Sequence, residues 1–128
     1  TNWYGVISPE IARVWGNRLY GCTICQEVCP VNVHVKPRSP RTSLGYVGPS
    51  LPLLEIIYMD ESEYRKKYPN NQITANWIDF KAIRRNALIA LGHIKDKATL
   101  PLLQKLSIDR DEVIAKTAQW AISNFSDR

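Results

Sequence analysis

Three cysteines lie within eight residues of this 128-residue chain, at Cys22, Cys25 and Cys29, and the chain has no others. Three thiols cannot all pair with one another, and so short a spacing places neighbouring cysteines poorly for a disulfide bridge. In a reducing compartment, clustered thiols usually bind a metal ion or a metal cluster instead. The sequence therefore predicts that these cysteines are metal ligands.

The spacing of the cysteines, closed by Pro30, is C-x2-C-x3-C-P. It matches the last three cysteines of the C-x2-C-x2-C-x3-C-P run that binds 4Fe-4S clusters in bacterial ferredoxins, where the cysteine before proline ligates the other cluster. Zinc is the alternative, as are inert thiols, but zinc sites favour two C-x2-C pairs or a Cys/His quartet. His34 is the nearest histidine, and Leu19 stands where the run has its first cysteine. The chain alone therefore cannot complete a four-thiolate cluster.

A helix is expected to lead into the motif. Ser8 as N-cap and Pro9 at the first helical position predict a helix that runs to Leu19. Gly21 favours a loop at the start of the motif, and Pro30 ends any helix just before it. Residues 37–52 contain four prolines and two glycines, which predicts a linker over the surface.

From residue 53 onward the pattern is helical. Residues 53–57 form a short apolar helix, and Asp60 with Glu63 predicts a capping box for a second helix to Tyr68. A long apolar stripe follows between Phe80 and Ile94.

An internal repeat links this stripe to the end of the chain. Residues 87–92 align with residues 118–123 at an offset of 31, with another helix between them at residues 98–107. Helix pairs that repeat at this length are typical of α-solenoids and resemble HEAT repeats. Because a solenoid needs roughly three repeats to stand alone, we expect this one to dock on the preceding helices or on another domain.

The predicted fold is therefore mainly α, with a partial ferredoxin-like segment and HEAT-like helical hairpins. Its expected parts are the second half of a 4Fe-4S cluster-binding domain at residues 1–36, a Pro/Gly-rich linker at residues 37–52, and a helical repeat domain at residues 53–128.

Composition and charge narrow the class of protein. An apolar content of 45% predicts a folded chain, and the sequence has neither an apolar stretch of roughly 20 residues nor a secretory signal. We therefore expect a cytoplasmic protein with no membrane partner. The net charge of +5 favours anionic partners such as nucleic acid, although such a charge is also ordinary for a small domain. Thr1 in place of Met predicts a fragment or a processed chain.

Two stretches of the sequence resemble one family. Residues 16–32 are similar to the second cluster motif of epoxyqueuosine reductases and of relatives with a double 4Fe-4S domain, and residues 85–92 with the repeat around Trp120 resemble that family's C-terminal tail. The resemblance is weaker between Pro37 and Thr74. It implies the C-terminal part of an oxidoreductase that reduces epoxyqueuosine in tRNA to queuosine, with electrons passing through two 4Fe-4S clusters to cobalamin.

The resemblance also implies roles for single residues. Cys22 and Cys25 would serve the second cluster, and Cys29 would ligate the first. The other ligands, the cobalamin pocket and the catalytic acid would lie in an N-terminal catalytic domain, and electrons would come from an external donor. This chain would then hold no complete active site and, in isolation, no cluster.

The helical tail of the family helps to hold tRNA. On the helix from Asp79, the resemblance therefore implies phosphate contacts for Lys81, Arg84 and Arg85, with a solvated helix face as the alternative.

Other residues receive simpler interpretations. His34 is expected to be a neighbour of the cluster rather than a ligand, and His93 to lie at a helix end. The four tryptophans are expected in the core: Trp3, Trp15, Trp77 and Trp120. Two alternative functions remain open: a non-catalytic HEAT-like binding module with zinc or vestigial cysteines, and an iron–sulfur reductase with another substrate.

Overall fold

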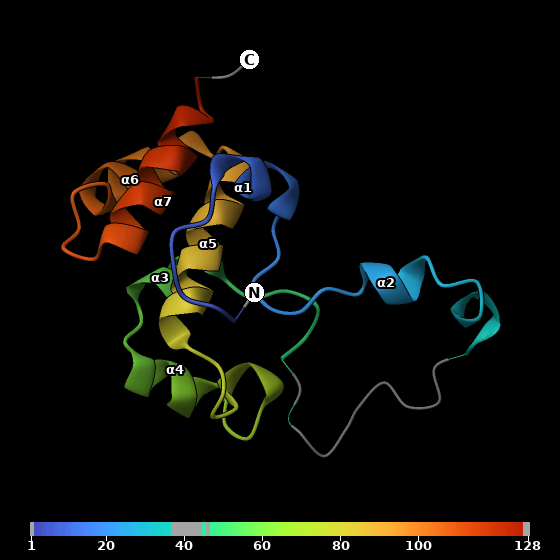
Figure 1. Cartoon of the computed structure of the whole chain (residues 1–128). Helices are drawn as coiled ribbons and strands as arrows, with labels where there is room; N and C mark the ends of the chain where they lie inside the picture. Colours follow the sequence, from blue (N-terminus) through green and yellow to red (C-terminus); the bar gives the residue numbers. More distant parts are fainter. Residues whose placement is uncertain (1, 37–44, 46, 127–128) are drawn as a thin grey trace.

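The computed structural model describes residues 2–36, 45 and 47–126, and these residues form helices and turns with no strand among them (Figure 1). The predicted mainly α fold class is confirmed. No helix in this part of the chain has the length and apolar character that crossing a membrane would require. In chain order the elements are α1 (Pro9–Trp15), α2 (Ile24–Glu27), η1 (Asn32–His34), α3 (Leu53–Tyr58), α4 (Glu61–Lys67), η2 (Gln72–Thr74), α5 (Phe80–Ile94), η3 (Lys97–Thr99), α6 (Leu100–Leu106) and α7 (Glu112–Ser123), where η marks a 3-10 turn.

Local capping chemistry sets the ends of several helices. Ser8 caps α1 through a hydrogen bond from the Ile11 N–H, as predicted. The helix ends at Trp15 rather than at Leu19, because Gly16 adopts a φ of +69° that the helix cannot continue through. At α4, Asp60 and Glu63 form the predicted capping box.

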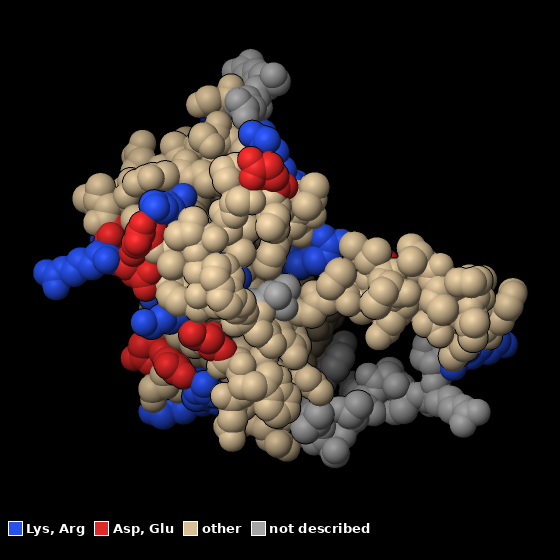
Figure 2. Space-filling model, viewed as in Figure 1, with Lys and Arg blue, Asp and Glu red and all other residues tan. Residues whose placement is uncertain are grey.

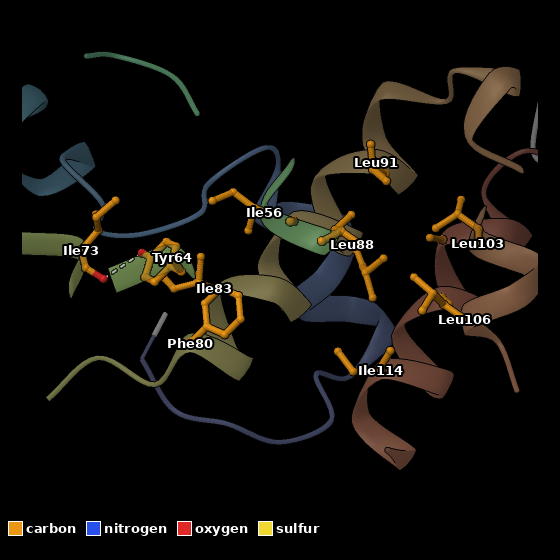
Figure 3. Close-up of a cluster of buried hydrophobic side chains, with 14 of the residues drawn as sticks. Ile56, Tyr64, Ile73, Phe80, Ile83, Leu88, Leu91, Leu103, Leu106 and Ile114 are labelled. Carbon is orange, nitrogen blue, oxygen red and sulfur yellow. Dashed lines mark hydrogen bonds between the residues drawn. The ribbon is translucent and has the colours of Figure 1, made fainter. Parts of the chain in front are cut away.

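The long helix α5 lies at the centre of the core and packs against α1, α3 and α7. Its side chains are buried along almost its whole length, from Phe80 to Gly92. Figure 3 shows Leu88 of α5 between Ile56 of α3 on one side and the residues of α6 and α7 on the other, while Ile83 lies beside Tyr64 of α4. Helix α5 is therefore the central helix of the core, with α1, α3 and α7 packed around it.

The predicted repeat corresponds to α5 and α7. Ile83 and Ile114 occupy equivalent positions, and both are buried, with exposed fractions of 1% and 4%. The two helices pack closely, because a Cβ on Gly92 would lie only 2.9 Å from the Cα of Ala121. The helix expected at residues 98–107 is present as η3 and α6. The specific likeness to HEAT repeats stays a prediction.

Residues 21–36, which we call the arm, extend away from the rest of the described chain, which we call the body (Figure 1). The two short elements of the arm, α2 and η1, contact each other. Residues 2–20 form the N-terminal segment of the body, in which α1 lies against α5. The predicted domain boundaries stay a prediction, and residues 37–44 and 46 of the predicted linker lie outside the described residues.

Candidate functional site

All three cysteines lie on the arm as free thiols. Cys22 and Cys25 are exposed and Cys29 is half-buried. Cys25 belongs to α2, while the other two cysteines flank this helix. Local hydrogen bonds shape the loop: the N–H of Asn32 donates to the Cys29 carbonyl at 2.9 Å, and the Asn32 side chain donates to the Gln26 carbonyl at 3.1 Å. The motif therefore has a local backbone structure of its own.

The thiols suit a metal cluster in chemical type but not in arrangement. Thiolates are the ordinary ligands of 4Fe-4S clusters. Among the described residues, however, no group of three or more His, Cys, Asp or Glu side chains could hold a metal ion. The arm, including His34, therefore does not form a complete metal site as it is arranged here. The assignment of the three cysteines as cluster ligands stays a prediction.

The surface of the arm is unusually apolar. Five of its aliphatic side chains are 45% to 76% exposed: Ile24, Val28, Val31, Val33 and Val35. In Figure 2 the charged side chains gather mainly on the body, and the arm is largely uncharged in this view. Large exposed apolar surfaces often mark interaction sites in proteins.

An open hollow of about 580 Å³ lies where the arm meets the body. Its walls include Arg18, Tyr20 and Cys22 on one segment, and Leu51 and Ile94 on two others. Cys22 is therefore the cysteine of the motif that borders a concave surface of the body.

Of the three basic residues predicted to contact tRNA, two reach the surface of α5. Lys81 is exposed, and its Nζ lies 5.7 Å from the centre of the Tyr4 ring. Arg84 is partly exposed, and its buried Nε has no hydrogen-bond partner among the described residues. Both side chains can present positive charge to a ligand.

Lys81 also lies near an acidic helix cap. Asp111 caps α7 by accepting from the Val113 N–H, and its other oxygen accepts a 2.6 Å hydrogen bond from the Tyr4 hydroxyl. Burial acts to raise the pKa of Asp111, but the hydrogen bonds from Tyr4 and the helix N–H groups, together with the Lys81 charge, lower that pKa overall. Burial and the same hydrogen bond raise the pKa of Tyr4. Asp111 is therefore stabilised as a carboxylate.

The third basic residue, Arg85, is buried and not exposed on the helix surface. Arg85 has an exposed fraction of 0%, and its Nη1 donates to the carbonyl oxygens of Trp3 and Gly5, each at 2.9 Å. Its guanidinium lies 5.6 Å from the Trp15 ring, and burial lowers the pKa of Arg85. Arg85 does not reach the surface for the expected phosphate contact in this structure, because residues 3–5 cover its side chain.

Two further polar residues of α5 were not predicted as part of a site. Asn86, fully buried, donates to the Leu19 carbonyl at 2.7 Å. His93 lies at the end of α1, with its Nε2 2.8 Å from the Ala12 carbonyl oxygen and 3.2 Å from the Gly16 nitrogen. The sequence feature that could have revealed their roles is the presence of these polar residues within the apolar stripe of the helix.

The tryptophan expectation holds only in part. Trp120 packs against the core, but Trp3 and Trp77 are 65% and 67% exposed. The apolar character of tryptophan did not distinguish core from surface at these two positions.

Known proteins provide a direct comparison. No protein-family model matches the chain. The epoxyqueuosine reductase of Bacillus subtilis is 36% identical over 130 residues, which cover 96% of this chain and 32% of that protein. An uncharacterized protein in the gldA 3'region of Geobacillus stearothermophilus is 37% identical over 97% of this chain and 57% of its own length.

Solved structures agree with the curated relatives. A crystal structure of epoxyqueuosine reductase with an epoxyqueuosine-modified tRNA-Tyr stem loop matches 96% of this chain and 33% of its own, with a TM-score of 0.73 and 31% identity. A Bacillus subtilis epoxyqueuosine reductase structure matches 94% of this chain, with a TM-score of 0.70 and 32% identity. The chain resembles the C-terminal part of an epoxyqueuosine reductase.

The likeness to epoxyqueuosine reductases extends over both the arm and the helical body, because it covers 94% to 96% of the chain in these structures. The chain spans about a third of the length of the epoxyqueuosine reductases that it matches. The resemblance expected from residues 16–32 and 85–92 is thereby confirmed.

Proposed function

We propose that this chain is the C-terminal part of a cytoplasmic oxidoreductase that reduces epoxyqueuosine in tRNA to queuosine. The observation that carries the proposal is the match of 96% of the chain, at a TM-score of 0.73, to an epoxyqueuosine reductase solved with its modified tRNA stem loop. Because the chain spans about a third of such proteins, the activity belongs to a longer polypeptide. That polypeptide would supply the catalytic domain and cobalamin, and an external donor would supply electrons.

The cysteines of the arm would contribute to two 4Fe-4S clusters. Cys22 and Cys25 are proposed for one cluster and Cys29 for the other, in line with the C-x2-C-x3-C-P spacing. Since three thiols do not complete a ligand set, the remaining thiolates would come from the rest of the polypeptide.

The basic surface of α5 would contact the tRNA backbone. Lys81 and Arg84 lie three positions apart on the helix, so they share one face, and both reach the surface. Phosphate contacts by such side chains add affinity without reading the base sequence. Arg85 is left out of the proposed contact because it is buried.

A complementation experiment tests the proposed activity. The full-length polypeptide is expressed in a bacterial host that lacks its own epoxyqueuosine reductase, and epoxyqueuosine and queuosine are quantified by mass spectrometry of digested tRNA. We expect queuosine to appear. In a Cys22→Ala/Cys25→Ala variant, conversion, iron content and the visible absorbance of the anaerobically purified protein should all be lost. Ser62→Ala, at an exposed residue of α4, is the matched control and should retain all three.

A second candidate function is a helical binding module whose cysteines bind zinc or have no role. The close packing of α5 on α7 around Gly92, as in a helical-repeat unit, favours it. Stoichiometric zinc without iron, and tRNA binding that survives loss of all three cysteines with no conversion of epoxyqueuosine, would support this candidate and exclude the reductase.

A further inference from the structure

Two adjacent polar residues are completely buried in the middle of α5, and the proposed chemistry does not use them. Arg85 and Asn86 both have exposed fractions of 0%, and both face the N-terminal segment of the body. Arg85 Nε and Nη2 donate to Asn86 Oδ1 at 3.0 and 2.8 Å. The two side chains therefore act as one hydrogen-bonded unit.

Among the described residues, the hydrogen bonds from this unit to the N-terminal segment go to backbone carbonyls. Arg85 donates to the carbonyls of Trp3 and Gly5, and Asn86 donates through Nδ2 to the carbonyl of Leu19. Since Asn86 Oδ1 accepts from Arg85, the orientation of the amide is determined and its NH₂ group must face Leu19. Buried charged and polar groups are costly unless they are hydrogen-bonded, so these contacts are strongly favoured once α5 has formed.

The position of these contacts along the chain points to their role. Leu19 lies three residues before Cys22, and the arm begins at Gly21. About two turns further along α5, His93 contacts Ala12 and Gly16 at the end of α1. Helix α5 thus holds the chain at several points up to the place where the arm leaves the body.

We propose that Arg85 and Asn86 are positioning residues for the cysteine arm: they fix the point and the direction from which it leaves the body. The structural part of this inference holds whatever the cysteines bind. Its consequence, that the thiols are aimed at ligand positions, rests on the proposed function.

A pulsed EPR measurement tests the inference without any metal. The measurement uses the whole 128-residue chain with Cys25→Ser and Cys29→Ser. One spin label is attached to Cys22 and the other to a cysteine introduced by Lys105→Cys on the exposed side of α6. Asn86→Asp keeps the acceptor for Arg85 but removes the donor to Leu19. We expect the distance distribution between the labels to broaden about twofold, because the local contact that restrains residue 19 is lost.

Two further variants make the result decisive. Arg85→Lys retains the charge but not the fork that reaches two carbonyls, and it should also broaden the distribution. Gln119→Glu is the matched control, since it makes the same amide-to-carboxylate change at a side chain that donates to the Ser107 carbonyl within the repeat. The control should leave the distribution unchanged.

Circular dichroism separates positioning from stability. The inference requires Asn86→Asp and Arg85→Lys to retain the helical signal while the distribution broadens. Folded variants with an unchanged distribution would overturn it, as would loss of the fold in both, which would show that the pair supports the core and not the arm. Neither result bears on iron content, so failure here is distinguishable from failure of the proposed function.

Discussion

At the scale of single residues, Tyr4 and Asp111 join segments that lie 107 positions apart in the sequence. Their hydrogen bond ties the N-terminal segment to the first turn of α7, where Asp111 also caps the helix. The carboxylate form is the one that accepts both kinds of hydrogen bond, which agrees with the lowered pKa of Asp111. The contact should therefore stabilise the fold in a pH-dependent way.

Tyr4→Phe should lower the free energy of unfolding by about 1 kcal/mol at neutral pH, because a hydrogen bond to a carboxylate is lost. The folded pKa of Asp111 lies below its ordinary 3.8, so the stabilisation is fully present above about pH 4 and is lost as the pH falls through the folded pKa. Urea unfolding at pH 7, 4 and 2.5 should show the gap between wild type and variant closing in acid. A gap that stays constant down to pH 2.5 would contradict this account.

Lys81 and Arg84 support a prediction about tRNA binding. In the full-length polypeptide, Lys81→Ala and Arg84→Ala should each weaken binding of a tRNA stem loop and reduce the slope of log K against log salt by about 1, because each removes a phosphate contact. Binding is measured by fluorescence anisotropy over a range of salt concentrations. Lys66→Ala, an exposed lysine on α4, is the control and should not change the slope. Unchanged slopes in both α5 variants would remove this surface from the proposed interface.

At the scale of elements, the contact between α5 and α7 depends on small residues. A Cβ on Gly92 would lie 2.9 Å from both the Cα of Ala121 and Cζ3 of Trp120, which is closer than real Cβ contacts. The aromatic ring has some freedom to turn, but the backbone of α7 does not. The glycine is thus explained by helix packing rather than by the end of α5, which continues to Ile94.

Gly92→Ala should destabilise the protein by about 1 kcal/mol. The gain in helix propensity of roughly 1 kcal/mol is outweighed by overpacking, which typically costs about 1–3 kcal/mol. Thermal unfolding followed by circular dichroism measures the difference. A variant with a higher melting temperature than wild type would mean that α7 can shift away without loss, and that the close approach is not required.

Local signals predicted the elements well, and distant contacts were not predictable from them. The Ser8 cap and the capping box at Asp60 each depend on residues near one another in the sequence, and the structure has both. The burial of Arg85 depends on Trp3 and Gly5, about 80 positions away, which no periodicity encodes. Residue type and spacing accordingly pointed to the cysteines as candidate ligands. They did not predict the hydrogen bonds from α5 that hold the chain before the cysteines.

At the scale of the whole molecule, the arm and the body differ in how they are stabilised. The body buries a continuous core around α5, whereas the described hydrogen bonds within the arm are local and its valines lie on the surface. Val28, Val31 and Val33 are each more than 65% exposed. Because the chain spans about a third of the reductases that it matches, we expect the rest of the longer polypeptide to cover this apolar surface and to supply the missing ligands.

This difference predicts where a protease cuts first. Glu27, the acidic residue of the arm, should be the first site of cleavage by a glutamate-specific protease in the 128-residue chain, because locally stabilised, exposed segments open most readily. Glutamates in the helices of the body, such as Glu61 and Glu112, should be cut more slowly. Mass spectrometry of timed digests identifies the products, and Glu27→Gln should abolish the early cut while leaving the later ones.

The same digest applied to the longer polypeptide tests what covers the arm. If the remaining chain packs on the valines around Glu27, opening of the arm requires loss of that interface. Cleavage at Glu27 should then be slower in the longer polypeptide than in the 128-residue chain, by at least the factor seen at the glutamates of the body. Equal rates at Glu27 in the two proteins would show that the arm stays uncovered. Its apolar surface would then need a separate partner, and the proposed completion of the cluster ligands by the rest of the chain would have to be abandoned.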